Sequence, residues 1–371
     1  MSIKQTIGHR ISILRTLLIL CVVFLHTVLA PNILKVDLTD FQTVLSCIFQ
    51  DRLGRFAVPT LTMISAYLLF GANLDQAPGK LYKKKFATLV VPFFFFNVLY
   101  FAVVYAVATV TGIGSLQEVV HKNHEQIINA LTGYNGMPLN GATHFLRDLF
   151  VLVLLTPVFS FFLRRAPLVG CFLIGLVFLT NMDGNLIQRN TMAVMFYLGG
   201  WCAVSKTDVT ILDKHAALAC VILLLACTLS VFLRIDNRMI YLLSPFLVWS
   251  AASKLVGTAL GNWAAKNSKY SFFVFLAHAP MLHVLDLLHV NSIAPKLPLV
   301  SSAIETAVVF IVLAAVYDIA AKRMPSLFNI MIGARVKTVV IADRRRQPRP
   351  DGAPVFSPEY RTSFISNLSF R

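Results

Sequence analysis

Long apolar segments separated by short polar connections restrict the fold of this 371-residue chain more than any other feature. Hydrophobic residues make up 57% of the sequence and charged residues only 13%, whereas a soluble domain carries roughly 25% charged residues. A helix that crosses a membrane needs about 20 apolar residues. The sequence therefore predicts an all-α, polytopic membrane bundle of about ten transmembrane helices, in the segments 11–30, 56–72, 87–111, 145–163, 167–180, 191–205, 215–233, 239–257, 271–289 and 298–321.

The distribution of lysine and arginine orients this bundle. Basic residues gather in alternate connections and in the region after residue 321. Cytoplasmic loops of membrane proteins are enriched in these residues, and ten spans with both termini in the cytoplasm satisfy the bias. The same pattern accounts for the net charge of +16, so we expect no nucleic-acid partner.

Composition divides the chain into two regions. Residues 1–325 hold every apolar segment and are predicted to form one transmembrane domain. Residues 326–371 are basic and contain prolines, which favours a mostly disordered cytoplasmic tail that touches anionic lipid through Arg344, Arg345 and Arg346. Most of the 6 cysteines fall in apolar segments and none forms a CxxC motif, so we expect reduced thiols and no metal site.

Two ionisable residues, Arg15 and His26, lie inside the first apolar segment. In a helix they are about three turns apart on one face, with a rise of about 16 Å between them. Such residues are costly at membrane depth and tend to mark functional sites. A neutral imidazole there can act as a general base on a hydroxyl, and Arg15 can pair with a carboxylate or a phosphate. The alternatives are a histidine that only packs between helices and an arginine that reaches lipid phosphate.

Two basic clusters are candidates for substrate binding. Arg52 and Arg55 are three residues apart and would share a helix face at the outer end of the second span, where an arginine pair suggests anion recognition. Lys84 and Lys85 belong to a basic run before the third span. That run either fixes the topology or attracts an anionic substrate from the cytosol.

Further candidates lie in the fourth and ninth spans. Arg147 and Asp148 stand at the outer end of the fourth span, with His144 one turn earlier. The carboxylate of Asp148 would orient either His144, at i, i+4 spacing, or His26 across the bundle. His278 lies near the middle of the ninth span, where a histidine indicates function. The alternatives are an interfacial anchor at Asp148 and a packing role for His278.

The ordered set of motifs resembles the acyltransferase-3 family of bacterial membrane O-acyltransferases. That family has an arginine and a histidine on the first span, separated by ten residues, as Arg15 and His26 are. Its later motifs VPxFxxISGYLL, LWFLRDL and YSFxxYxxH are matched here by RFAVPTLTMISAYLLF, THFLRDLFVL and YSFFVFLAH, and KKKFATLVVPF matches a basic stretch before a proline-containing third span. The chain departs from the family at Ala66, at His144 and at Thr88, which replaces the second arginine of an RxxR pattern.

The resemblance implies an acyl-CoA-dependent, membrane-bound O-acyltransferase of the bacterial inner membrane, most similar to the stand-alone succinoglycan-type succinyltransferases and acetyltransferases. Such an enzyme transfers a succinyl or acetyl group from cytosolic acyl-CoA to a sugar hydroxyl of an exopolysaccharide or its lipid-linked precursor. It needs no bound cofactor, and its partners are acyl-CoA, the glycan acceptor and membrane lipid. Catalytic roles are implied for Arg15, His26 and Asp148.

In this interpretation His26 is the general base, or is itself acylated as a relay, and Asp148 holds it. Arg15 and the lysines guide the phosphates of coenzyme A, and Arg52 or Arg55 contacts the glycan or the carboxylate of a succinyl group. Arg147 and His278 complete the candidate substrate-binding set.

The alternative function is a proton-coupled permease or a polysaccharide exporter that uses buried ionisable residues as a relay. The sequence shows no evident internal repeat, which disfavours a transporter of the inverted-repeat kind.

Overall fold

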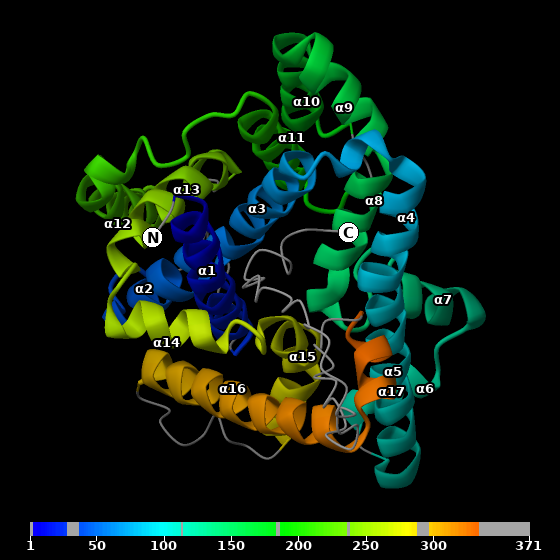
Figure 1. Ribbon diagram of the computed structural model, residues 1–371. Coiled ribbons are helices and arrows are strands. Elements are labelled where there is room, and N and C mark those ends of the chain that lie inside the picture. Colours follow the sequence, from blue (N-terminus) through cyan, green and yellow to red (C-terminus); the bar gives the residue numbers. More distant parts are fainter. Residues whose placement is uncertain are drawn as a thin grey trace, which may run out of the picture.

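The computed structural model describes residues 3–27, 37–112, 114–182, 186–235, 238–287 and 297–333. Throughout these residues the chain forms helices joined by turns and short loops, which confirms the predicted all-α membrane bundle (Figure 1). The α-helices are α1 (Ile3–His26), α2 (Phe41–Ser46), α3 (Ala57–Gly71), α4 (Pro78–Lys85), α5 (Val91–Thr111), α6 (Gly114–Val120), α7 (His124–Thr132), α8 (His144–Leu154), α9 (Thr156–Arg165), α10 (Pro167–Thr180), α11 (Thr191–Val204), α12 (Ala216–Phe232), α13 (Arg238–Ala251), α14 (Ala259–Asn267), α15 (Ser271–Leu287), α16 (Pro298–Arg323) and α17 (Pro325–Met331).

Every predicted apolar segment contains one of these helices or a bent pair of them. Within the described residues, 5 helical stretches are long and apolar enough to cross a membrane: Gln5–His26, Phe41–Gly71, Pro78–Thr111, Asp213–Phe232 and Pro298–Arg323. Two bent pairs qualify when each is taken as one span, and α10, α11 and α15 are shorter apolar helices. The number of spans by length alone is thus 5, or up to 7 with the bent pairs.

The bent pair formed by α13 and α14 extends beyond the span predicted at 239–257. The chain reverses by 113° between the two helices. Gly257 allows the reversal because its φ of +84° lies in the left-handed region that favours glycine. Thr258 then caps α14 by accepting a hydrogen bond from the amide of Gly261. The bend falls at the end of the predicted apolar segment, so α14 lies in the connection before the next span.

Helix α1 is surrounded by packing partners and is the centre of the bundle. It lies against α14, α15, α16 and α3 (Figure 1). Thr16 ties it to α14 through a hydrogen bond of 2.7 Å to the carbonyl of Ala264. At its N-terminal end the buried guanidinium of Arg10 donates two hydrogen bonds to Asp213 and stacks on the Trp249 ring at 4.8 Å. These contacts fix the orientation of the helix that carries Arg15 and His26.

Close helix packing also fixes α3 against α11. A Cβ atom at Gly199 would lie 2.3 Å from the carbonyl oxygen of Met63, so only glycine fits there. Small residues at such contacts let two backbones approach each other inside a membrane. On the side predicted to be cytoplasmic, the buried carboxylate of Asp75 accepts hydrogen bonds from Arg164 and Ser160, which joins the end of α3 to α9.

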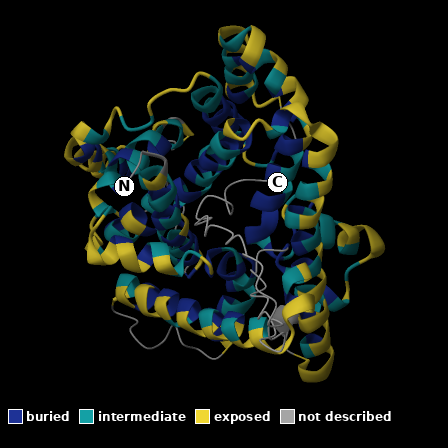
Figure 2. Cartoon of the chain, viewed as in Figure 1, coloured by how far each residue is buried: buried dark blue, intermediate teal, exposed yellow. Residues whose placement is uncertain are grey.

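Burial follows the pattern of a membrane bundle. Buried residues face inward on most helices, and exposed residues line the outside (Figure 2). Many of the exposed residues on α5, α10, α12 and α16 are large and apolar, such as Phe172 on α10 and Ile311 on α16. In a soluble protein an exposed surface of this kind would be a liability, whereas here it suits contact with lipid.

The last described helix, α17, begins at the predicted boundary between the domain and the tail. Phe328 on α17 is buried and packs edge-on against Phe273 and Tyr317, with ring centroids 5.4 and 5.2 Å away. The folded unit therefore extends at least to Gly333. The rest of the expected tail, 334–371, includes the three arginines at 344–346 and lies outside the described residues.

Candidate active site

Arg15 and His26 lie on the face of α1 that is turned toward the bundle. They differ by about 20° around the helix axis. Both side chains are exposed, although the apolar residues on the same face are not. His26 faces the interior of the bundle, because its ring contacts the fully buried His278. The buried neighbours within about 60° of Arg15 on this face are Ile11, Leu18, Ile19 and Val22.

The ring of His26 contacts the ring of His278 on α15, with centroids 5.4 Å apart. His278 is fully buried, and its Nδ1 lies 2.8 Å from the carbonyl oxygen of Phe275. A carbonyl only accepts hydrogen bonds, so Nδ1 carries a proton and Nε2 is the basic nitrogen of the neutral ring. Within the described structure that Nε2 has no hydrogen-bond partner. His278 thus presents an unused acceptor beside His26.

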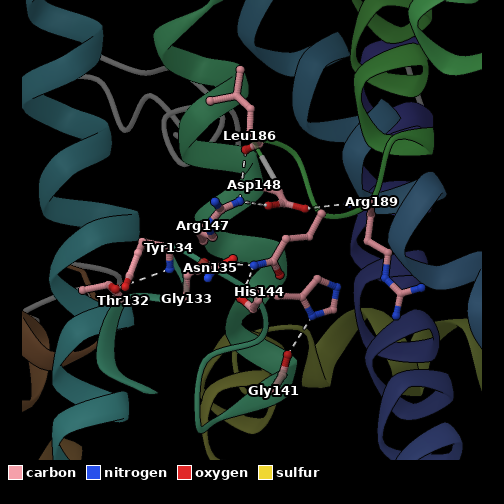
Figure 3. A network of polar contacts seen from close by, with 12 residues as sticks. Thr132, Gly133, Tyr134, Asn135, Gly141, His144, Arg147, Asp148, Leu186 and Arg189 are labelled. Atoms are coloured by element: carbon pink, nitrogen blue, oxygen red, sulfur yellow. Dashed lines mark hydrogen bonds and ion pairs between the residues drawn. The ribbon is translucent and has the colours of Figure 1, made fainter. Parts of the chain in front are cut away.

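His144 repeats this arrangement at the start of α8. Its Nδ1 lies 2.7 Å from the carbonyl oxygen of Gly141, and its buried Nε2 has no partner among the described residues. The His144 ring and the side chain of Arg189 extend to the same side of α8 (Figure 3). His26 interacts electrostatically with both of them and with Arg55. Four basic side chains from α1, α8, the segment before α3 and the loop before α11 therefore share one region.

Asp148 holds the loop that carries Arg189. Its carboxylate is fully buried, accepts a 2.8 Å hydrogen bond from Arg147 Nη1 and accepts a 3.1 Å bond from the backbone amide of Arg189 (Figure 3). Within the described residues Asp148 forms no hydrogen bond with His144 or His26; its two oxygens bond Arg147 and the loop amide. Asp148 thus holds the loop of Arg189 in place, and its catalytic role stays a prediction.

Arg147 is held in the same network. Its Nη1 also donates to the carbonyl of Leu186 at 3.0 Å, and its side chain is 14% exposed. Its expected part in substrate binding stays a prediction.

The arginine pair of the second span meets at one carboxylate in the structure. Arg52 lies in the π-helix Cys47–Leu53 and Arg55 in the 3₁₀ turn Gly54–Phe56, so the two do not stand on one α-helix as expected. Both arginines reach Asp51, Arg55 through Nε at 2.5 Å and Arg52 through Nη1 at 3.5 Å. Only Arg55 lies in electrostatic range of His26. Arg52 is 4% exposed, and its Nε and Nη2 have no hydrogen-bond partner within the described structure.

The lysines expected to meet the donor lie shortly before α5. Lys84 and Lys85 end α4, and a second π-helical segment, Phe86–Val90, joins α4 to α5. Thr88, which replaces an arginine of the family pattern, is covered by the turn after α17. A Cβ atom at Gly333 would lie 2.7 Å from the Cα atom of Thr88. Contact of Lys84 and Lys85 with an acyl donor stays a prediction.

A buried amide network that sequence reasoning missed supports the two histidines. Asn97 on α5 donates to the hydroxyl of Thr143 at 2.9 Å and accepts from the amide of Asn140 at 3.1 Å. Asn140 in turn donates to the carbonyl of Leu276 on α15 at 2.9 Å. Asn97, Asn140 and Thr143 are all fully buried. The network fixes the turn before His144 against the helix that carries His278. A sign of it in the sequence was Asn97, an amide side chain inside an apolar segment.

The loop before α11 was also missed, because its polar sequence is that of an ordinary connection. Gln188 donates through Nε2 to the carbonyl oxygens of Gly133 and Gly136. Its neighbour Arg189 enters the region of His26. The loop therefore connects the turn after α7 with the candidate active site.

Comparison with known proteins agrees with this arrangement. The chain is similar to the succinoglycan biosynthesis protein ExoH of Rhizobium meliloti (strain 1021), with 25% identity over 374 residues that cover 96% of this chain and 99% of the relative. No solved structure matches the chain. The acyltransferase domain of the acyltransferase-3 family matches residues 9–320. This match includes α1 with Arg15 and His26, the arginines before α3, α8 with Asp148, and α15 with His278. The chain therefore belongs to the acyltransferase-3 family and is a membrane-bound acyltransferase.

Proposed function

We propose that the protein transfers a succinyl or acetyl group from cytosolic acyl-CoA to a sugar hydroxyl of a bacterial exopolysaccharide or its lipid-linked precursor, in the inner membrane. Membership of the acyltransferase-3 family supports the reaction class. The full-length similarity to a succinoglycan biosynthesis protein supports a polysaccharide acceptor. The observation that carries the proposal is the exposed His26 ring beside His278, among the basic side chains of His144, Arg55 and Arg189.

In the reaction, His26 removes the proton of the acceptor hydroxyl as general base. The hydroxyl oxygen attacks the thioester carbonyl, the carbon–sulfur bond breaks, and coenzyme A leaves as a thiol with the proton that His26 held. Arg55 and Arg189 lie where the oxyanion of the tetrahedral intermediate would gain from nearby positive charge. No metal ion or bound cofactor is needed for this step.

Two histidine nitrogens without a hydrogen-bond partner in the described structure support the proposed binding of the acceptor glycan. Nε2 of His278 and Nε2 of His144 are buried acceptors without a partner in the described structure. A sugar presents several hydroxyl donors, and two fixed acceptors near a base would orient one of them. This assigns substrate binding to His278 and adds His144 to the sequence-derived set.

The proposed binding of acyl-CoA is assigned to the basic residues nearer the predicted cytoplasmic face. Arg15 lies about 16 Å along α1 from His26, and Lys84 and Lys85 end α4. The phosphates of coenzyme A are separated from its thioester by the extended pantetheine arm, so a grip at these residues is compatible with chemistry at His26. Arg55, or the buried Arg52, would bind the free carboxylate if the donor is succinyl-CoA.

Mass spectrometry of the surface glycan tests the proposed function. A strain that lacks the protein should export glycan of normal amount without one acyl group, and the wild-type gene should restore that group and thereby identify it. Loss of the surface glycan itself in the deletion strain would contradict the proposal and would favour an exporter. An unchanged acyl content would contradict it as well.

A further inference from the structure

A polar cavity of about 410 Å³ lies in the long connection between α5 and α8. It is formed by α7 and the turn that follows, and the predicted topology puts it outside the cytoplasm, on the side where α1 ends at His26. Amides, one carboxylate, one amine and one tyrosine ring make up its polar and aromatic lining: Lys122, Glu125, Gln126, Asn129, Tyr134 and Asn135.

The side chains of the cavity are held in place before any ligand binds. Tyr134 donates its hydroxyl to Glu125 at 2.9 Å, and this bond raises the pKa of Tyr134, which stays a neutral donor. The side chain of Asn129 accepts from the backbone amide of Asn135 at 2.8 Å. Gly133 ends α7 with a φ of +61°, and a Cβ atom there would lie only 3.0 Å from the Cδ atom of Pro138. The turn 133–139 is therefore a fixed wall of the cavity.

The chemistry of this lining fits a carbohydrate. A sugar ring has an apolar face of C–H groups, which packs on an aromatic ring, and hydroxyls that both donate and accept hydrogen bonds. Tyr134 is 45% exposed and offers that ring, while the amides and the carboxylate offer donors and acceptors. The lining has no net charge, because the positive charge of Lys122 offsets the negative charge of Glu125. This disfavours a highly charged ligand. We propose that this cavity is a carbohydrate subsite that binds the acceptor glycan away from the hydroxyl that is acylated.

The subsite is connected to the proposed active site through Gln188. The carbonyl oxygens of Gly133 and Gly136, which flank Tyr134, accept hydrogen bonds from the Gln188 side chain. The next residue, Arg189, donates its amide to Asp148 and turns its side chain toward the histidines (Figure 3). A glycan held at Tyr134 would thus contact a turn that is hydrogen-bonded to the loop of Arg189. The inference rests on the proposed function, since it takes the glycan to be the acceptor.

Replacement of the tyrosine tests the subsite with a matched control. Initial rates of the purified full-length protein in lipid nanodiscs are measured at saturating acyl-CoA. The acceptors are deacylated oligosaccharides of increasing length, prepared from the surface polysaccharide of the strain that expresses the protein. Tyr134→Ala should raise the KM for long oligosaccharides about tenfold, the loss of one aromatic contact, with kcat and the KM for acyl-CoA unchanged. Tyr134→Phe keeps the ring and should stay near the wild type. Tyr105→Ala removes a tyrosine of similar exposure on α5, 43% against 45%, and should change nothing.

Calorimetric titration of the same oligosaccharides without acyl-CoA separates this proposal from the proposed function. Binding to the wild type that weakens in Tyr134→Ala, but not in Tyr105→Ala, supports the subsite even if no transfer is seen. Equal affinity in the wild type and Tyr134→Ala would overturn the subsite even if transfer is normal. Absence of saturable binding to the wild type would overturn it too.

Discussion

The imidazole rings of His26 and His278 lie 5.4 Å apart, centroid to centroid, although 251 residues separate them in the chain. Helix α1 ends at His26, and α15 carries a fully buried His278 whose Nδ1 is fixed by the backbone carbonyl of Phe275. The pair thus combines an accessible imidazole with a rigid one whose Nε2 remains available. This is the arrangement on which the proposed acyl transfer depends.

Removal of the hydrogen-bond-accepting Nε2 atom of His278 should lower kcat more than it weakens the binding of acyl-CoA. His278→Phe keeps an aromatic ring against His26 but deletes Nε2, so we expect kcat to fall about 10- to 100-fold, with the KM for acyl-CoA changed little. The measurement is a kinetic titration of each substrate. His121→Ala changes an exposed histidine of the outer connection and should have no effect. A wild-type kcat in His278→Phe would contradict the role given to Nε2.

The ion pair of Asp148 and Arg147 should act on the site through the loop that carries Arg189. Asp148→Asn and Arg147→Ala each release one end of that network and should raise the KM for the acceptor. Because the two residues form one unit, the double variant should lose little more than either single variant. A double-mutant cycle on the KM values measures this coupling. Additive losses, or a large loss in Asp148→Asn with none in Arg147→Ala, would show that Asp148 acts on the substrate directly.

The buried amide network should contribute to both stability and rate. Asn140→Ala removes the donor to Leu276 and leaves that carbonyl unpaired in the core, which should cost about 1–3 kcal/mol. We also expect a several-fold fall in kcat, since the turn before His144 would lose its tie to α15. Thermal unfolding in detergent and initial rates measure the two effects. Thr109→Ala removes an exposed hydroxyl that bonds only its own helix and should be neutral in both. Unchanged kcat in Asn140→Ala would limit the network to a structural role.

The pair of Arg10 and Asp213 should stabilise the bundle without affecting turnover. Asp213→Ala leaves the buried guanidinium of Arg10 without its carboxylate, and the side chain of Asp213 is 24% exposed. Loss of a partly exposed partner should cost about 2 kcal/mol, less than for a fully buried pair. Asp208→Ala removes an exposed carboxylate that bonds Thr210 locally and serves as control. A lower melting temperature at normal rate per folded molecule is expected for Asp213→Ala, and equal melting temperatures would contradict this.

The sequence predicts the helices and the face of α1 well, for a physical reason. A membrane-spanning helix has to satisfy its own backbone and present apolar side chains, so long apolar segments mark each helix. The helical period of about 100° per residue places Arg15 and His26 on one side whatever surrounds them. Both features are local, and local features can be read from one chain.

The hydrogen-bond partners of Asp148 and the contacts of the arginine pair could not be predicted from the sequence in the same way. Asp148 has an allowed i, i+4 relation to His144, yet its second oxygen bonds an amide 41 positions away in sequence. Both arginines meet at Asp51, and the segment Cys47–Leu53 that carries Asp51 and Arg52 is a π-helix, a change of period that no apolar pattern reveals. The reversal at Gly257 likewise depends on a single left-handed residue inside an apolar segment.

Acyl transfer by the His26→Ala variant tests the central claim most directly. The purified protein is given radiolabelled succinyl-CoA or acetyl-CoA and deacylated oligosaccharide, with the wild type and His121→Ala beside it and membrane insertion checked for each. We predict that His26→Ala inserts normally and loses at least about 100-fold in rate, the contribution of a general base. Transfer at the wild-type rate by a well-inserted His26→Ala protein would contradict the account.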